Sequence, residues 1–198
     1  MFTGLIQAVG RLEQAQARGG DLRMRIGTGA MPVADLQLGE SISVSGVCLT
    51  VVEFDASSFC ADVSNETLSL TTLGALPIGA QLNLERAMLP TTRLGGHLVA
   101  GHVDGVGHLR SIVADGRSQR WRFSIPPELS RYLAVKGSVC VDGVSLTVNA
   151  SDGSGFDVNL VPHTVANTAF AQTVVGAAVN LEVDLIARYL ERLAQTTR

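Results

Sequence analysis

Hydrophobic and polar residues alternate with period two along most of the chain, in short runs separated by turns rich in glycine, aspartate and serine. Alternation of this kind is typical of β-strands with one buried face. It predicts strands over residues 3–13, 22–28, 41–45, 49–54, 59–63 and 81–85, with a glycine-rich turn over 17–21. Short helical segments are predicted over residues 31–36, 66–74 and 125–133, the last because proline suits the first helical position.

The second half of the chain repeats the first at a constant shift of 97 residues. At that shift 26 of the first 86 residues are identical to their counterparts, where composition alone gives about 6. Asn83-Leu84-Glu85, for example, returns as Asn180-Leu181-Glu182. A gap-free repeat of this length indicates one module used twice. With about six strands per module and little helix, the expected fold is all-β, with two tandem closed antiparallel barrels that leave no strand edge exposed.

After residue 184 the pattern changes to helical spacing. Apolar residues then gather on one side of a predicted helix that has no copy in the first module: Leu185, Ile186, Tyr189, Leu190 and Leu193. This stripe must be covered either by the chain's own barrel or by other copies of the chain, and we favour oligomerisation. The predicted domains are therefore residues 1–96, residues 97–184 and a terminal helix over 185–198.

Composition excludes several classes of protein. Hydrophobic residues make up 46% and charged residues 17% of the chain, which is typical of a folded, soluble protein. A net charge of −3 gives no basic surface for nucleic acid. No apolar run reaches the length of a membrane span, and the N-terminus lacks the pattern of a signal peptide. An odd number of cysteines, Cys48, Cys60 and Cys140, favours reduced thiols in the cytoplasm, with Cys60 and Cys140 expected as core fillers.

Candidate chemistry lies where the two modules differ. The two copies carry different side chains, with a titratable or nucleophilic group in at least one of them, at five pairs of positions: Cys48 and Ser145, Leu5 and His102, Gln7 and Asp104, Ser45 and Asp142, and Glu66 and His163. His97 and His102 could be metal ligands, but no further Cys, His or Glu completes a set, so no metal is expected. The glycines around them could serve barrel packing or bring a ligand close to the backbone. The residues alone indicate a two-barrel protein that binds a polar planar ligand.

A set of motifs then resembles the riboflavin synthase family, from residue 1 to about residue 193. The motifs are Met1-Phe-Thr-Gly4, Gly46-Val-Cys-Leu-Thr-Val51, Glu66-Thr-Leu68, Gly95-Gly-His-Leu-Val-Ala-Gly-His-Val-Asp-Gly105, Val141-Asp-Gly-Val-Ser-Leu-Thr-Val148 and Pro162-His-Thr164. The resemblance implies two six-stranded Greek-key barrels and a C-terminal helix that holds a homotrimer. It implies a cytoplasmic transferase of the last step of riboflavin biosynthesis, which needs neither metal nor cofactor. It leaves open whether the chain associates with lumazine synthase.

The implied reaction is the dismutation of two molecules of 6,7-dimethyl-8-ribityllumazine to riboflavin and 5-amino-6-(D-ribitylamino)uracil. The resemblance assigns catalytic importance to Phe2, Ser41, Cys48, His97, His102 and Asp142. It assigns substrate contacts in the first barrel to Gly4, Leu5, Ile6, Cys48, Leu49, Thr50, Asp62, Val63, Ser64, Asn65, Glu66 and Thr67. In the second barrel it assigns them to Gly101, His102, Val103, Lys136, Ser145, Leu146, Thr147, Val161, Pro162, His163, Thr164, Val165 and Ala166. It also implies that each active site joins the first barrel of one subunit to the second barrel of its neighbour.

Two other functions remain open at this stage. One is a non-catalytic carrier of lumazine or flavin with the same two barrels, although such carriers lose the His-Val-Asp motif that is present here as residues 102–104. The other is a purely structural trimer, which leaves the unlike titratable pairs unexplained.

Overall fold

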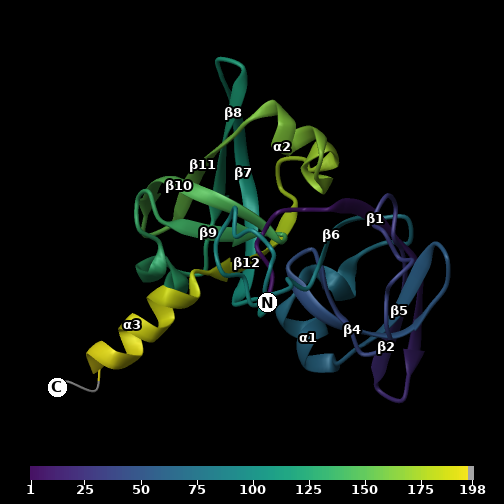
Figure 1. Cartoon of the computed structure of the whole chain (residues 1–198). Coiled ribbons are helices and arrows are strands. Elements are labelled where there is room, and N and C mark those ends of the chain that lie inside the picture. Colours follow the sequence, from purple (N-terminus) through teal and green to yellow (C-terminus); the bar gives the residue numbers. More distant parts are fainter. Residues whose placement is uncertain (196–198) are drawn as a thin grey trace.

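The computed structural model describes residues 1–195, which form two closed six-stranded antiparallel β-barrels and a C-terminal helix (Figure 1). The strands of the first barrel are β1 (Ala8–Arg18), β2 (Asp21–Gly27), β3 (Ser41–Val44), β4 (Val47–Phe54), β5 (Ser58–Val63) and β6 (Gln81–Arg86). They are arranged around the barrel in the order β1-β2-β5-β4-β3-β6. Between β5 and β6 lie α1 (Asn65–Leu70) and the 3-10 helix η1 (Thr72–Ala75).

The second barrel repeats this plan. Its strands are β7 (Gly105–Asp115), β8 (Ser118–Ser124), β9 (Ser138–Val141), β10 (Val144–Asp152), β11 (Gly155–Leu160) and β12 (Ala178–Val183). Their order, β10-β11-β8-β7-β12-β9, is the order of the first barrel when each strand is matched to its repeat. The short helices are η2 (Pro127–Tyr132), α2 (Pro162–Ala166) and η3 (Ala169–Gln172). The predicted all-β fold of two barrels is confirmed.

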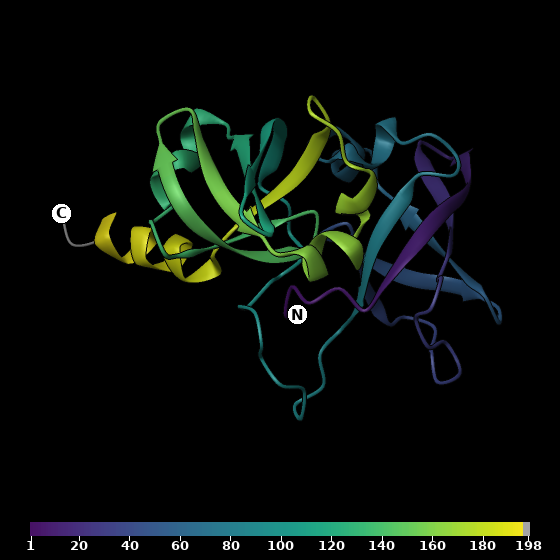
Figure 2. The ribbon, with the colours of Figure 1, turned by 90° about the horizontal axis from the view of Figure 1, so that it is seen from above.

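Each barrel has its own core, made by the inward residues of the alternating strands. The first core holds Phe59, Met24 and Ile26, and the second is built around Trp121, Phe123 and further aromatic residues. In the second core the Trp121 and Phe170 rings lie 5.3 Å apart between centroids, close enough for a favourable aromatic contact. The boundary predicted between residues 96 and 97 stays a prediction, because residues 87–104 all lie between β6 and β7. Part of this connection forms a long loop that Figure 2 shows away from both barrels.

Three local predictions need correction. The first strand begins at Ala8 rather than at residue 3, because residues 1–7 leave the first barrel and cross to the second. Residues 31–36 form no helix, only a turn in which the Leu36 N–H donates to the Val33 carbonyl at 3.1 Å. The segment 66–74 is split into α1 and η1 at Thr71, whose hydroxyl accepts the Leu73 N–H at 3.3 Å.

Two equivalent asparagines hold the barrels together. The Asn83 amide donates to the Asp142 carbonyl at 2.8 Å and accepts the Ala169 N–H at 2.7 Å. Asn180 makes the matching bonds to the Ser45 carbonyl and the Thr72 N–H, both at 2.8 Å. Because each asparagine is buried on one barrel and contacts the other, the barrels are related by an approximate two-fold axis and form one unit.

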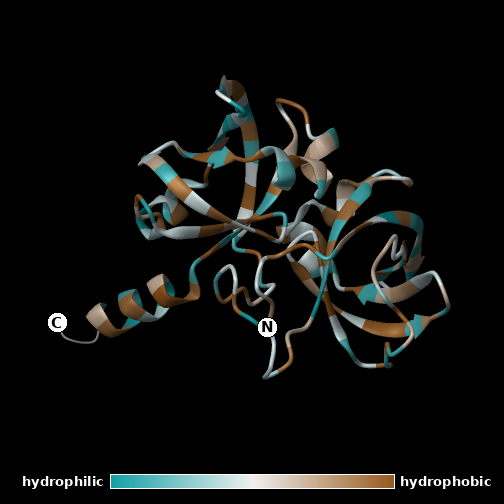
Figure 3. Ribbon diagram, turned by 45° about the horizontal axis from the view of Figure 1, so that its top comes forward, coloured by the Kyte–Doolittle hydropathy of each residue, from teal (hydrophilic) through white to brown (hydrophobic). Residues whose placement is uncertain are grey.

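The terminal helix α3 (Leu185–Gln195) confirms the helical pattern up to residue 195, and residues 196–198 of the predicted helix lie outside the described residues. It contacts the second barrel mainly through polar side chains, with ion pairs from Arg188 to Asp104 and from Glu191 to Arg131. Its apolar residues are left exposed, including Ile186, Leu190 and Tyr189. Figure 3 shows this stripe as brown segments along the helix. No helix within residues 1–195 is long and apolar enough to cross a membrane.

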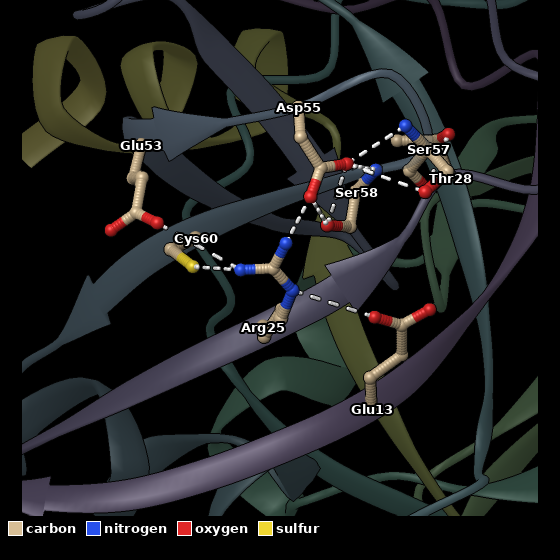
Figure 4. Close-up of polar contacts among 8 residues, drawn as sticks. All are labelled: Glu13, Arg25, Thr28, Glu53, Asp55, Ser57, Ser58 and Cys60. Atoms are coloured by element: carbon tan, nitrogen blue, oxygen red, sulfur yellow. Dashed lines mark hydrogen bonds and ion pairs between the residues drawn. The ribbon is translucent and has the colours of Figure 1, made fainter.

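Cys60 is buried as predicted, but it lies outside the cluster that fills the first barrel. It lies on the outward side of β5 beneath Arg25, whose guanidinium is 3.8 Å from the sulfur (Figure 4). The same guanidinium pairs with Asp55, Glu13 and Glu53. At the equivalent position of the second barrel Asp157 pairs with Arg122 at 3.0 Å, so this side of each barrel is a charged network rather than apolar packing.

Candidate functional site

The segments that lead into the two barrels lie side by side between them. We call residues 1–7 the first lead-in and residues 98–104 the second lead-in. Phe2 and Val99 form an antiparallel bridge, with the Phe2 N–H 2.8 Å from the Val99 carbonyl and the Val99 N–H 3.1 Å from the Phe2 carbonyl. Phe2 is fully buried in a small cluster with Val99, Cys140 and Cys48. The side chain predicted to matter for catalysis therefore packs beneath the site, between the barrels.

Each lead-in crosses to the other barrel. The Gly101 carbonyl accepts the Cys48 N–H of β4 at 2.9 Å, and the Gly4 carbonyl accepts the Ser145 N–H of β10 at 2.8 Å. Both glycines have left-handed backbones, with φ of +79° and +75°. A Cβ on Gly101 would lie 2.7 Å from the Cys48 Cβ, and one on Gly4 would lie 2.6 Å from the Ser145 Cβ. Only glycine allows the two backbones this approach.

This crossing corrects the barrel assignment made from the sequence. Ile6 packs against the core of the second barrel and Val103 against the core of the first. We therefore define a first half-site of residues 48–50, 62–67 and 101–103, and a second half-site of residues 145–147, 161–166 and 4–6. The reason is physical: a lead-in whose backbone bonds to the opposite barrel must present its side chains there. The predicted residues are the same, but residues 4–6 and 101–103 exchange barrels.

The first half-site presents Cys48 and Thr50 on the outward side of β4. Cys48 is half-buried and Thr50 is exposed. Ser41 of β3 lies directly opposite Thr50 in the strand register, so their side chains share one face. His102 is exposed on the second lead-in, next to Gly101 and therefore close to Cys48. The structure thus brings four of the residues predicted for the site to one side of the first barrel.

The second half-site carries a serine–histidine pair. His97 Nδ1 lies 2.7 Å from Ser145 Oγ, and the imidazole is buried. Its Nε2 has no hydrogen-bond partner among residues 1–195. Burial lowers the pKa of His97, and the carboxylate of Asp184 opposes that shift only partly. A neutral imidazole with Nδ1 directed at a hydroxyl can accept its proton, so Ser145 is the hydroxyl best placed here for acid–base work.

Asp142 occupies a different position from the other candidates. It lies in the turn between β9 and β10 with a left-handed backbone, φ +45°, as does its repeat Ser45. Its carboxylate accepts the Asn180 N–H at 2.8 Å. Burial raises the pKa of Asp142 to about 7, against the lowering effect of that hydrogen bond. The side chain therefore stabilises the turn at the contact between barrels, two residues before Val144 and the start of β10.

Two further carboxylates hold the lead-ins. Glu85 of β6 accepts the N–H groups of Thr3 and Gly4 and the Thr3 hydroxyl, at 2.7, 2.9 and 2.6 Å. Glu182 of β12 accepts the N–H groups of Ala100, Gly101 and His102 at 2.6, 2.9 and 3.0 Å. Burial raises the pKa of Glu182 to about 7 and that of Glu85 above its ordinary value, while the donors lower both.

The remaining predicted contacts lie at the ends of β5 and β11. Residues 62–67 run from β5 into α1, where Ser64 caps the helix by accepting the Thr67 N–H at 3.2 Å. Residues 161–166 run from β11 into α2, and Pro162, Val165 and Ala166 line a cavity of about 220 Å³. Lys136 lies apart from this cavity, before β9, with a left-handed φ of +70°. Other cavities are larger: one of about 290 Å³ is lined in part by His102 and Val103, and one of about 240 Å³ in part by Asp142. Cavities of about 350 and 600 Å³ are lined by none of the predicted site residues.

Within residues 1–195 no three His, Cys, Asp or Glu side chains are arranged to hold a metal ion.

Comparison with known proteins identifies the family. The model of the lumazine binding domain matches the chain twice, at residues 3–87 and 100–184. Riboflavin synthase from Photobacterium phosphoreum is 48% identical over 193 residues, which is 98% of this chain and 88% of that protein. The chain belongs to the riboflavin synthase family. Riboflavin synthase from Bacillus subtilis (strain 168) is 38% identical over 97% of this chain and 89% of that protein.

Solved structures show the same fold at lower identity. The crystal structure of LumP complexed with riboflavin matches with a TM-score of 0.83 and 22% identity, over 92% of this chain and 99% of that chain. The structure of LumP complexed with 6,7-dimethyl-8-(1'-D-ribityl) lumazine matches with a TM-score of 0.81. At this identity the similarity concerns the fold alone: LumP and this chain share the same arrangement of two tandem barrels.

Sequence reasoning missed the residues that hold the two half-sites in place. In the sequence these residues belong only to the repeated tripeptide, which is equally typical of a structural strand: Asn83, Glu85, Asn180 and Glu182. One signal could have identified the glutamates. The same glutamate occurs in both copies on a strand expected to be buried, and a buried carboxylate needs hydrogen-bond donors. The contact of His97 with Ser145 carried no local signal, because 48 residues separate them.

Proposed function

We propose that the chain is a riboflavin synthase that converts two molecules of 6,7-dimethyl-8-ribityllumazine to riboflavin and 5-amino-6-(D-ribitylamino)uracil by transferring a four-carbon unit. The observation that carries this proposal is the pair of half-sites, built on one backbone plan but with unlike chemistry. The first half-site contains Cys48 and His102. The second half-site contains Ser145, whose hydroxyl contacts His97. A dismutation needs this difference, because one lumazine donates the four-carbon unit and the other accepts it.

The two rings must be held face to face for the transfer. Gly101 and Gly4 let the lead-ins lie directly against Cys48 and Ser145, which fixes the backbone around each half-site where a ring would be held. Holding two reactants in this way supplies a large part of a rate acceleration through proximity and orientation alone. A proton must also leave the C7 methyl group of one lumazine, whose ring system delocalises the resulting charge. We assign proton transfer in the second half-site to Ser145, backed by the neutral imidazole of His97.

We further propose that the protein is a homotrimer in which the first half-site of one subunit faces the second half-site of the next. The exposed apolar residues of α3 support this assembly, because burying four large apolar side chains is worth about 1.5–3 kcal/mol each. The free Cys48, Cys60 and Cys140 support a cytoplasmic location. Association with lumazine synthase remains a proposal to be tested by co-sedimentation of the two proteins.

The direct test is to add purified protein to 6,7-dimethyl-8-ribityllumazine and follow the formation of riboflavin by its fluorescence. A synthase consumes two molecules of lumazine for each riboflavin that it forms, and releases one pyrimidine product. A carrier binds the lumazine and shifts its fluorescence without consuming it. Stoichiometric binding with no turnover would therefore overturn the proposed enzyme in favour of the carrier.

A further inference from the structure

The glutamates at the end of the repeated tripeptide lie outside the reacting groups described above. Each is almost completely buried, with 3% of Glu85 and 4% of Glu182 exposed. Neither carboxylate is paired with a lysine or arginine in the ion pairs formed within residues 1–195. A buried carboxylate is costly unless donors surround it, so the donors must account for its presence in both copies.

Those donors come from the lead-ins. Three consecutive N–H groups, of Ala100, Gly101 and His102, converge on the two oxygens of Glu182. Three donors of Thr3 and Gly4 converge on Glu85 in the same way. Consecutive N–H groups that converge on one carboxylate fix the backbone that carries them, and each of these bonds strengthens when the carboxylate is ionised.

The opposite side of each lead-in forms a half-site. The carbonyl of Gly101 is bonded to Cys48, and the carbonyl of Gly4 is bonded to Ser145. Each lead-in is therefore held on one side by a glutamate of its own barrel and on the other by a strand of the opposite barrel. His102 follows directly on the second lead-in, and its own N–H is one of the three groups that Glu182 accepts.

We propose that Glu182 and Glu85 are positioning residues for the reaction: Glu182 sets the place of Gly101 and His102 over Cys48, and Glu85 sets the place of Gly4 over Ser145. This inference rests on the proposed function, since it assigns a part in that reaction to residues that contact neither reacting ring. Each glutamate acts on one half-site only. Glu182 belongs to the second barrel but holds the lead-in of the first half-site, and Glu85 belongs to the first barrel but holds the lead-in of the second half-site.

The matched variants are Glu182→Gln and Glu85→Gln. Glutamine keeps the volume and one acceptor oxygen, but its NH2 group faces backbone N–H donors, so at least one donor loses its acceptor. Glu13→Gln is the control, because Glu13 is an exposed carboxylate on the outer side of the first barrel beside Arg25. We expect kcat to fall at least tenfold for the two buried positions in folded protein and to stay within twofold of the parent for the control.

Mixed trimers assign each lesion to a half-site. Glu182→Gln refolded with Ser145→Ala should recover activity, and Glu182→Gln refolded with Cys48→Ser should not, because only the first pair damages opposite half-sites. A merely structural defect would show no such selectivity. If Cys48→Ser and Ser145→Ala also fail to restore each other, the assembly proposal has failed, and the kcat values of the single variants still decide the positioning role.

A milder variant covers the case in which the buried glutamines do not fold. Thr3→Val removes only the hydroxyl that donates to Glu85 at 2.6 Å and keeps both N–H donors. We expect kcat to fall severalfold with KM for lumazine changed less. The proposal is overturned if folded Glu182→Gln, Glu85→Gln or Thr3→Val turns over lumazine as fast as the parent.

Discussion

Gly101 lies directly against Cys48: its carbonyl accepts the Cys48 N–H at 2.9 Å, and a Cβ on Gly101 would lie 2.7 Å from the Cys48 Cβ. The two residues belong to different repeats, so this contact joins the halves of the chain at the point where we place the first half-site. Phe2 supports the contact from below, since the same Cβ would lie 2.9 Å from its ring.

Gly101→Ala should therefore abolish most turnover. The added methyl group collides with Cys48 and Phe2, and the left-handed backbone adds about 1 kcal/mol of strain. Gly116→Ala is a matched control, because Gly116 also has a left-handed backbone, φ +61°, but no atom lies within 4 Å of its added Cβ. Both kcat and the melting temperature should fall more for Gly101→Ala, and equal effects of the two variants would contradict the close contact.

The apolar side of α3 should be needed for assembly. Leu190 is 62% exposed in the single chain, so Leu190→Glu costs the isolated subunit little but places a charge in the proposed trimer contact. Arg192→Glu introduces the same side chain on the exposed polar side of the helix and serves as control. Sedimentation should show monomers for Leu190→Glu and trimers for Arg192→Glu. Trimers that survive Leu190→Glu would mean that another surface holds the assembly.

The ion pair between Arg188 and Asp104 should hold α3 to the second barrel. Asp104 also accepts the Val183 N–H at 2.7 Å, and its repeat Gln7 accepts the Arg86 N–H at 3.0 Å through an amide oxygen. Asp104→Asn therefore keeps the backbone contact and removes only the ion pair. We expect trimers of this variant to dissociate at a severalfold higher concentration than the parent in sedimentation experiments at low salt. Unchanged dissociation would show that the pair contributes nothing to assembly.

Asp142 should make stability depend on pH. Its pKa is raised from 3.8 to about 7 by burial, so the folded protein holds this proton more tightly than the unfolded chain does. The stabilisation is fully present below about pH 4 and is lost as the pH rises to about 7. Asparagine does not ionise, so Asp142→Asn should raise the free energy of unfolding relative to the parent increasingly over this interval, by about 4 kcal/mol at pH 8. Denaturant unfolding of both proteins at about pH 4 and pH 8 measures the difference in free energy of unfolding. The same difference at both pH values would contradict a buried carboxyl with a raised pKa.

The barrels could be predicted from the sequence because period-two alternation and the 97-residue repeat are properties of local runs. The crossing of the lead-ins could not, because residues 3–7 continue the alternating pattern of the strand that follows them. Gly4 on this crossing has a left-handed backbone, φ +75°, but glycine is compatible with either course, so the sequence does not show which is taken.

The candidate residues of the site could be named from motifs, but not their grouping. Ile6 and Val103 are apolar residues at matching positions of the repeat, and either barrel could bury them. His97 precedes the second module and has no counterpart in the first, so the repeat gave no indication that it would contact Ser145. Cys60 was misplaced because one small apolar residue in a strand can face either side when its neighbours are Phe59 and Ala61.

The composition of the two half-sites has one further consequence for mixed trimers. Cys48 and His102 lie in the same half-site, whereas Cys48 and Ser145 lie in opposite ones. If a site joins the first half-site of one subunit to the second of the next, a trimer that mixes Cys48→Ser and Ser145→Ala chains contains a junction with both lesions and a junction with neither. A trimer that mixes Cys48→Ser and His102→Gln chains has no such repaired junction.

Riboflavin formation after unfolding and refolding these inactive variants together in pairs tests the crossed half-sites directly. We expect Cys48→Ser with Ser145→Ala to recover up to about one active site in each mixed trimer, and Cys48→Ser with His102→Gln to recover none. Recovery in the second pair, or its absence in the first with mixed trimers verified by mass, would contradict the crossed half-sites or their meeting between subunits.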